Sequence, residues 1–250
     1  MNFNEKVVLI TGAAGGIGSA CAEKFAALGA KVAVVDCDKQ GAENVAAAIA
    51  EKGFAAKAFI ADVTDFPSVQ ACVRSVAEEW GGIDILVNVA GGSARKNRAL
   101  FWEQNVSVFR HVMEINLFGT FYFAKECAPY MIEKKWGRII NISSIVGLNG
   151  HIKHSEYSAA KGGVITMTRS MAKEIGQYGV TVNTVCPGII PTSNTGSQND
   201  LGYSNFLNMT PSTSDIVGAT LYLASDEARF VTGIELSVDG GRHLAMRGTE

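Results

Sequence analysis

Short apolar runs alternate with helix-patterned segments along the chain, and this alternation constrains the fold more than any other feature. We expect seven strands, at residues 6–11, 31–36, 55–62, 84–90, 137–143, 180–186 and 234–240. Several runs, such as KVVLIT and KVAVVD, are almost continuously apolar, which is typical of parallel strands buried on both faces of a sheet. The sequence therefore predicts an α/β fold: a doubly wound, seven-stranded parallel sheet with helices on both faces.

The segments between these runs supply the covering helices. We expect helices at residues 17–28, 39–51, 68–80, 106–132, 158–178 and 214–223. No internal repeat, low-complexity tract or charged linker divides the sequence, so residues 1–250 are predicted to form a single domain. The long polar interval at 191–205 predicts a substrate lid at about residues 189–214, with a merely solvated connector as the alternative.

Composition excludes several classes of protein. The 250 residues are 47% hydrophobic and carry a net charge of −2, whereas nucleic-acid binding normally needs a basic excess. No apolar run approaches the roughly 20 residues that span a bilayer, and the N-terminus lacks the pattern of a signal peptide, so we expect a cytoplasmic protein without membrane partners. The five cysteines are widely spaced, which predicts buried, reduced thiols and no metal site.

A glycine-rich stretch, TGAAGGIG at residues 11–18, joins the first strand to the first helix. Gly12 permits a tight turn, Gly16 allows backbone to approach a pyrophosphate, and Gly18 lets the helix pack close to the sheet. Free N–H groups at the helix N-terminus would then face the phosphates. The stretch predicts a dinucleotide site, with a flexible strand-to-helix turn as the alternative.

Asp36 ends the second predicted strand, where an acidic residue can accept hydrogen bonds from both ribose hydroxyls of a dinucleotide. The same carboxylate would repel a 2′-phosphate. The glycine turn contains no Arg or Lys, and Cys37 rather than a basic residue follows Asp36. These residues favour NAD(H) over NADP(H).

Asp62 and Asn88 end or lie near the end of the third and fourth predicted strands. Ligands bind at this carboxyl edge in open parallel sheets. We therefore expect Asp62 to face an adenine and Asn88 to hold the cofactor or its loop. The alternative for each is that it only caps the following helix.

The pentapeptide YSAAK places Tyr157 and Lys161 one helical turn apart on the same face. Free tyrosine, with a pKa near 10, is a poor base at neutral pH, and a nearby ammonium stabilises its phenolate. Such a pair can exchange a proton with a hydroxyl while hydride moves, and the small residues between leave room for a ribose. A pair that only packs on a helix surface is the alternative.

Together these motifs resemble the short-chain dehydrogenase/reductase family, which has a Rossmann fold. The resemblance covers essentially the whole length and also includes NVAG at 88–91, Asn116, NISS at 141–144 and PGIIPT at 187–192. It implies an NAD(H)-dependent oxidoreductase that moves hydride between nicotinamide and a secondary alcohol or ketone. A non-catalytic NAD(H)-binding sensor or scaffold is the alternative.

The resemblance implies four catalytic residues: Asn116, Ser144, Tyr157 and Lys161. Ser144 rather than Ser143 is selected because the family's serine lies 13 positions before its tyrosine. Tyr157 would be the acid/base, Ser144 would polarise the substrate oxygen, and Asn116 would hold a proton-relay water, with a satisfied core asparagine as the alternative. Motifs and resemblance together assign the cofactor to Gly12, Ala14, Gly16, Ile17, Gly18, Asp36, Asp62, Val63, Asn88, Ala90, Gly91, Tyr157, Lys161, Pro187, Gly188, Ile190 and Thr192.

The resemblance also implies a homotetramer in which the helices at 106–132 and 158–178 pack against other copies; ordinary core within one chain is the alternative for their apolar residues. Two departures concern the cleft: Val89 stands where the family commonly has asparagine, and the segment after the lid looks shorter. Basic residues on two rim loops predict an anionic substrate, although such charges usually only solvate a surface. They are Arg95, Lys96, Arg98, His151, Lys153 and His154.

Overall fold

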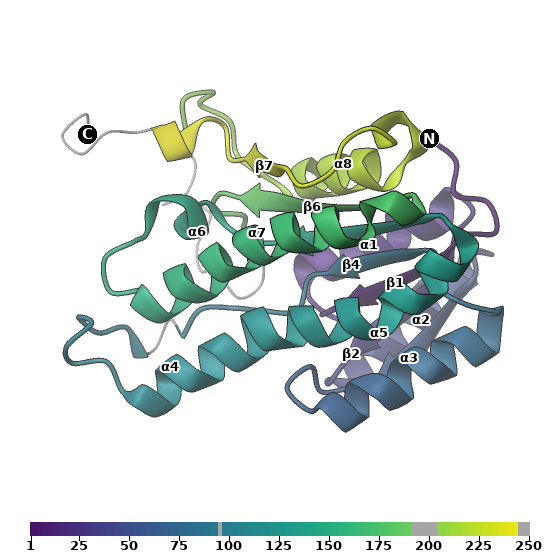
Figure 1. The fold of residues 1–250 in the computed structure, drawn as a ribbon, viewed down its shortest axis with the longest axis horizontal. Helices are drawn as coiled ribbons and strands as arrows, with labels where there is room; N and C mark the ends of the chain where they lie inside the picture. Colours follow the sequence, from purple (N-terminus) through teal and green to yellow (C-terminus); the bar gives the residue numbers. More distant parts are fainter. Residues whose placement is uncertain (95–96, 192–204, 245–250) are drawn as a thin grey trace.

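A parallel β-sheet runs through the chain (Figure 1). The computed structural model describes residues 1–94, 97–191 and 205–244. In these residues the strands are β1 (Val7–Thr11), β2 (Lys31–Asp36), β3 (Ala56–Ile60), β4 (Ile85–Asn88), β5 (Gly137–Ile142), β6 (Val180–Pro187) and β7 (Glu235–Val238). Their order is β3-β2-β1-β4-β5-β6-β7, and every neighbouring pair is parallel, which confirms the predicted α/β fold.

Helices cover both faces of the sheet, so each face has its own core. On one face lie α1 (Gly16–Ala27), α2 (Lys39–Glu51) and α8 (Thr213–Ala224); on the other lie α3 (Phe66–Trp80), α5 (Gly119–Lys134) and α7 (Ser155–Ile175). Successive strand side chains alternate between these cores: Val8 packs with the first group and Leu9 with the second. Burial on both faces explains the continuously apolar runs.

The strand order reverses between β1 and β4, since β1 lies between β2 and β4. At the carboxyl end of β1 the Thr11 hydroxyl accepts hydrogen bonds from the backbone N–H groups of Val89 (3.1 Å) and Ala90 (3.2 Å). The chain after β4 is thereby held beside the glycine turn. Ligands in open α/β sheets bind at such a reversal.

The helix predicted over 106–132 is present and extends to Lys134, but it contains a π-helical turn that the sequence did not predict. The structure has α4 (Val106–Met113), a π-helical turn (Glu114–Phe118) and then α5. The Asn116 amide donates to the Val112 carbonyl (2.9 Å), and the Thr120 hydroxyl donates to the Asn116 carbonyl (2.8 Å). Side chains thus bond carbonyls along the helix and compete with its regular ladder, which is a recognised cause of such bulges.

Several other boundaries differ from expectation. Helix α7 starts at Ser155, so Tyr157 lies in its first turn, and it ends in a 3₁₀ turn (Gly176–Tyr178). Short helix α6 (Ile145–Asn149) was not predicted; its five residues are too few to show a helical period. Two further 3₁₀ turns span Asp226–Ala228 and Arg242–Leu244.

All five cysteines are free thiols, as expected, and four of them are buried while Cys37 is exposed. Within the described ranges no cluster of three or more His, Cys, Asp or Glu side chains could hold a metal ion. The helices in that part of the chain are also too short or too polar to cross a membrane.

Candidate active site and cofactor cleft

The turn after β1 forms a cradle made of backbone. Helix α1 begins with Gly15 as its N-cap, without a side-chain cap and without an acidic residue in its first turn. Gly12 has a φ of +63°, and a Cβ there would lie 2.8 Å from the backbone of Ala90; a Cβ on Gly18 would overlap the Gly12 carbonyl oxygen. Only glycine fits these positions, and the open N–H groups suit the pyrophosphate of a dinucleotide.

Beside this turn lies a cavity of about 490 Å³, here called the cofactor cleft. Nine predicted residues line it: Gly12, Gly16, Ile17, Gly18, Asp36, Asp62, Val63, Ala90 and Gly91. Seven lining residues were not predicted: Gly15, Cys37, Ala61, Thr64, Val89, His111 and Ile115. His111 and Ile115 come from α4 and the π-helical turn. Their spacing of four residues could have indicated that they share a helix face, but the sequence did not show that this face borders the cleft.

Asp36 is held at the cleft wall by two backbone groups. Its carboxylate accepts hydrogen bonds from the N–H of Ala14 in the glycine turn (3.0 Å) and from the N–H of Asp38 (3.0 Å). Ala14 itself does not line the cleft but orients this carboxylate. The acidic group therefore stands at the end of β2 where a ribose would lie.

Asp62 and Asn88 have different surroundings. Asp62 lines the cleft and accepts hydrogen bonds from the N–H (2.9 Å) and hydroxyl (2.8 Å) of Thr64. Asn88 is buried under the sheet edge, where its amide donates to the Asn141 side chain (2.9 Å), which in turn donates to Thr168 (2.9 Å). Neither caps the next helix, because the N-caps of α3 and α4 are Asp65 and Asn105.

Tyr157 and Lys161 project together from the first turns of α7. The Lys161 ammonium lies 5.7 Å from the centroid of the Tyr157 ring and donates to the Ile142 carbonyl at the end of β5 (2.8 Å). Burial lowers the pKa of Lys161 to about 8, with Cys186 acting in the opposite direction. A buried ammonium beside a phenol is well placed to stabilise a phenolate.

The two serines after β5 point in different directions, as strand alternation requires. Ser144 is the N-cap of α6, and its Oγ accepts from the Val146 N–H (3.2 Å). Because that oxygen accepts, its own proton can still be donated to a ligand. Ser143 instead donates to the Lys161 carbonyl (2.8 Å) and so joins the end of β5 to α7.

Asn116, in the π-helical turn, is fully buried and faces the same region. Its amide exchanges two hydrogen bonds with the backbone of Gly92, each of 3.0 Å. A Cβ on the neighbouring Gly91 would overlap the Asn116 Oδ1 atom and lie 3.1 Å from the Lys161 Nζ atom. Asn116, Gly91 and Lys161 therefore converge, while the proton-relay role of Asn116 stays a prediction.

The nicotinamide end of the predicted site is described only in part. Pro187 ends β6, the Gly188 N–H donates to the Val238 carbonyl (3.1 Å), and Ile190 is buried. Thr192 and half of the predicted lid, residues 192–204, lie outside the described residues.

The family model described as short chain dehydrogenase matches residues 6–201. The chain belongs to this family. It is therefore an oxidoreductase with the fold that the family's motifs predicted, and members of the family bind a nicotinamide cofactor. The glycine cradle and the acidic residue at the end of β2 fit such a cofactor.

Curated relatives match along nearly the whole chain. A 3-oxoacyl-(acyl-carrier-protein) reductase of Vibrio cholerae is 39% identical over 98% of this chain and 100% of its own length. A meso-2,3-butanediol dehydrogenase of Serratia marcescens is 35% identical over 96% of both chains. These short-chain dehydrogenases differ in substrate, so family membership alone does not name the substrate of this chain.

Solved structures of short-chain enzymes have the same fold. A short-chain type dehydrogenase/reductase from Mycobacterium ulcerans superposes with a TM-score of 0.93 at 28% identity, covering 98% of this chain and 92% of that one. Levodione reductase gives 0.91 at 30% identity, covering 98% and 100%.

The predicted basic rim is only partly described for this short-chain dehydrogenase, since Arg95 and Lys96 lie outside the described residues. His151 and His154 contact each other, with their Nδ1 atoms 3.1 Å apart. Burial lowers the pKa of His154; Arg98 and His151 add to this, whereas the Ile152 carbonyl and Glu156 oppose it. A neutral His154 gives little support to an anion site, and the anionic substrate stays a prediction.

Proposed function

We propose that this short-chain dehydrogenase is an NAD(H)-dependent alcohol dehydrogenase or ketone reductase with Tyr157 as its acid/base. The observation that carries the proposal is the buried Lys161 ammonium, which lies beside the Tyr157 ring and donates to the Ile142 carbonyl at the end of β5, two residues before the helix-capping Ser144. The names of the two relatives, a 3-oxoacyl reductase and a 2,3-butanediol dehydrogenase, both refer to a ketone or a secondary alcohol.

The residues divide the proton chemistry between them. When bound, the nicotinamide supplies or accepts the hydride. Tyr157 takes the hydroxyl proton as hydride leaves the carbinol carbon and returns it in the reverse direction. Ser144 donates a hydrogen bond to the substrate oxygen and keeps its proton, while the Lys161 ammonium, 5.7 Å from the tyrosine ring, stabilises the phenolate.

Asp36 supports the choice of NAD(H). Its carboxylate is fixed by the Ala14 and Asp38 N–H groups at the wall of the cofactor cleft, so it cannot easily swing away from an incoming 2′-phosphate. A like charge at that place disfavours NADP(H), whereas ribose hydroxyls can donate to it.

The test is an assay of the purified protein with NAD or NADP and a panel of secondary alcohols, read as absorbance of the reduced cofactor. The proposal expects turnover with at least one alcohol and higher kcat/KM with NAD. Cofactor binding without turnover on a broad panel would favour a binding-only protein, and a preference for NADP would remove the cofactor assignment.

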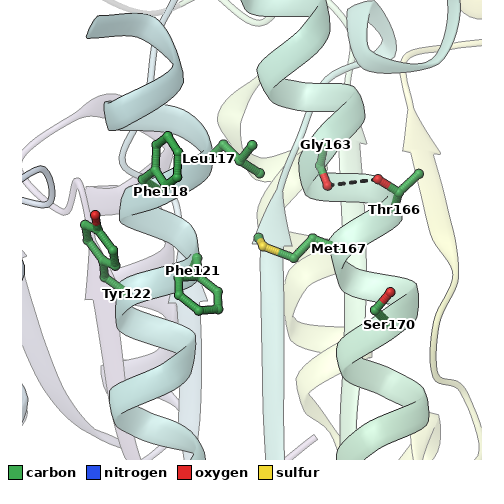
Figure 2. A pocket seen from close by; sticks show the side chains of 8 residues that line it. All are labelled: Leu117, Phe118, Phe121, Tyr122, Gly163, Thr166, Met167 and Ser170. Atoms are coloured by element: carbon green, nitrogen blue, oxygen red, sulfur yellow. Dashed lines mark hydrogen bonds between the residues drawn. The ribbon is translucent and has the colours of Figure 1, made fainter. Parts of the chain in front are cut away.

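We also propose that the face formed by α5 and α7 is covered by a second copy within a homotetramer. It contains a groove of about 580 Å³, in which Phe118 and Phe121 remain 45% and 40% exposed. Figure 2 shows its lining residues: Leu117, Phe118, Phe121, Tyr122, Gly163, Thr166, Met167 and Ser170. Exposed apolar surface of this kind marks association sites.

Light scattering tests this assembly. The wild-type protein should have the mass of four chains, and Phe121→Glu should reduce that mass because it places a charge in the apolar groove. Glu126→Gln is the matched control, since it changes a charge on the same helix outside the groove. A monomeric wild-type protein would contradict the proposal.

A further inference from the structure

A buried carboxylate directly precedes the proposed catalytic tyrosine. Glu156 is fully buried, and its Oε2 atom accepts a hydrogen bond from the Gln104 side-chain amide (3.2 Å). The two residues are 52 positions apart in the sequence. A buried acid is costly to the fold, and apolar side chains of similar size are often at least as stabilising. Its presence beside Tyr157 therefore suggests a role other than filling space.

Gln104 connects Glu156 to a stretch of chain that we call the rim segment, residues 97–105. Its amide nitrogen also donates to the Asn97 carbonyl (3.3 Å), and its side-chain oxygen accepts from the Asn105 N–H (2.9 Å). One side chain thus contacts both ends of the rim segment and the first turn of α7. The rim segment can move relative to α7 only if this bond to Glu156 breaks.

The rim segment stands next to the active site by topology. It lies between β4, whose carboxyl end borders the cofactor cleft, and α4, whose N-cap is Asn105. It presents two exposed aromatic side chains, Phe101 and Trp102, with ring centroids 5.0 Å apart. Loops in this position contact substrates in parallel α/β enzymes, so the placement of this segment affects what reaches Tyr157.

The location of Glu156 within α7 gives the contact a fixed anchor. It lies in the first turn of a 21-residue helix, directly before Tyr157, so its backbone is held together with that of the tyrosine. The hydrogen bond from Gln104 therefore connects the rim segment to the part of α7 that carries Tyr157.

We propose that Glu156 is a positioning residue which, through Gln104, ties the rim segment to the helix that carries Tyr157 and Lys161. The residues of the rim segment that contact substrate then stay at a constant distance from Tyr157. This inference rests on the proposed function, because the tie matters for turnover only if Tyr157 acts on a substrate bound at the rim. Glu156 does not line the cofactor cleft, so in this proposal it acts through its neighbours.

The experiment is a double-mutant cycle with Glu156→Ala, Gln104→Ala and both together. Each single change should raise KM for the alcohol about tenfold with a smaller fall in kcat, because misplaced substrate contacts weaken productive binding. The double variant should be no worse than either single one, since both break the same tie. Binding of ADP-ribose, measured by calorimetry, should not change.

Two further variants separate positioning from general stability. Glu156→Gln can still accept from Gln104, so its KM should stay within about threefold of wild type. Glu103→Ala removes an exposed carboxylate from the same segment without changing Gln104 or Glu156 and is the matched control. If Glu156→Ala does not fold, the KM of Gln104→Ala and the hydrogen exchange of the rim segment decide the question. Additive effects, or an unchanged KM in Gln104→Ala, would overturn the proposal.

Hydrogen exchange provides a readout that does not need activity. Amides of residues 97–105 should exchange faster in Gln104→Ala than in wild type and in Glu103→Ala. Amides of α7 should keep their protection in all three proteins. Equal exchange in all three proteins would reject the tie. If the wild-type protein turned over no alcohol, the proposed function would fail, and the exchange result would still decide for or against the tie.

Discussion

The two halves of the active-site region differ in the chemical groups that form them. The cofactor half, around β1, β2 and the start of α1, consists mainly of backbone: a glycine turn, open N–H groups and one carboxylate held by two amides. The catalytic half consists of side chains from α6, α7 and the π-helical turn, which meet across long stretches of sequence. Backbone geometry is set locally, whereas side-chain convergence depends on the whole fold.

Tyr157→Phe should have the largest effect and should affect only the catalytic half. It removes the transferable proton but keeps the ring, so kcat should fall about 10²-fold or more, as is typical for lost acid/base catalysis. ADP-ribose binding by calorimetry should be unchanged, since the cofactor half is intact. Near-normal turnover would exclude Tyr157 as the acid/base.

Replacing Lys161 tests whether the buried ammonium in the catalytic half lowers the free energy of unfolding. Its pKa is lowered to about 8 by burial, so between pH 8 and about 10.5 the unfolded chain binds more protons than the folded one. The free energy of unfolding of the wild type should therefore rise through this range relative to Lys161→Met. The difference in free energy of unfolding between the two proteins should change by up to roughly 3 kcal/mol over this range, because one pKa unit corresponds to about 1.4 kcal/mol.

Urea denaturation of the cofactor-free proteins at several pH values measures this gap. Lys173→Met is the matched control, because it removes a lysine from the same helix near its solvent-exposed end. A gap that is independent of pH from 8 to 10.5 would show that Lys161 titrates as an ordinary lysine.

Asp36→Ser should change the cofactor half alone. Without the carboxylate the repulsion of a 2′-phosphate disappears and ribose contacts weaken, so the ratio of kcat/KM for NAD to that for NADP should fall about tenfold or more. The KM for the alcohol should stay the same. Asp38→Ser is the control, since its side chain caps α2 and does not line the cleft. A ratio that does not move would assign cofactor choice to other residues.

Ser143→Ala should give the smallest effect and sharpens the distinction between the two serines. The change removes one hydrogen bond to the Lys161 carbonyl, which should cost about 1 kcal/mol of stability and lower kcat only slightly. Ser144→Ala should instead lower kcat by about 10², while loss of its N-cap bond to Val146 costs a similar ~1 kcal/mol of stability. Thermal unfolding and steady-state kinetics on both variants distinguish these roles, and equal losses of kcat would mean that the assignment to Ser144 is wrong.

What could be predicted from the sequence follows the same division. The glycine turn, Asp36 and the strand runs depend on local conformation and periodicity, and the sheet that they predicted is present. The YSAAK spacing placed Tyr157 and Lys161 on one helix face because a helix repeats locally. The family comparison then supported the reaction class.

The missed features depend on distant partners. Asn88 was predicted to hold the cofactor or its loop, which stays a prediction, while the bond of its amide to Asn141, 53 residues away, was not foreseen. Asn116, in the π-helical turn, accepts a hydrogen bond from the N–H of Gly92, 24 residues earlier. Neither partner is visible in a local pattern, and a polar side chain in an apolar stretch does not reveal which distant backbone group it will satisfy.

The π-helical turn at 114–118 makes this part of the chain tolerant of a one-residue change of length. A π-helical turn holds about one residue more than an α-helical turn, so deleting one residue here would restore α-helical hydrogen bonding and leave α5 close to its orientation relative to α4. A deletion within α5 would instead rotate the residues beyond it by about 100°, and buried Met131 would leave the core. An alignment of related sequences can therefore place a one-residue gap within this turn without losing the register of α5.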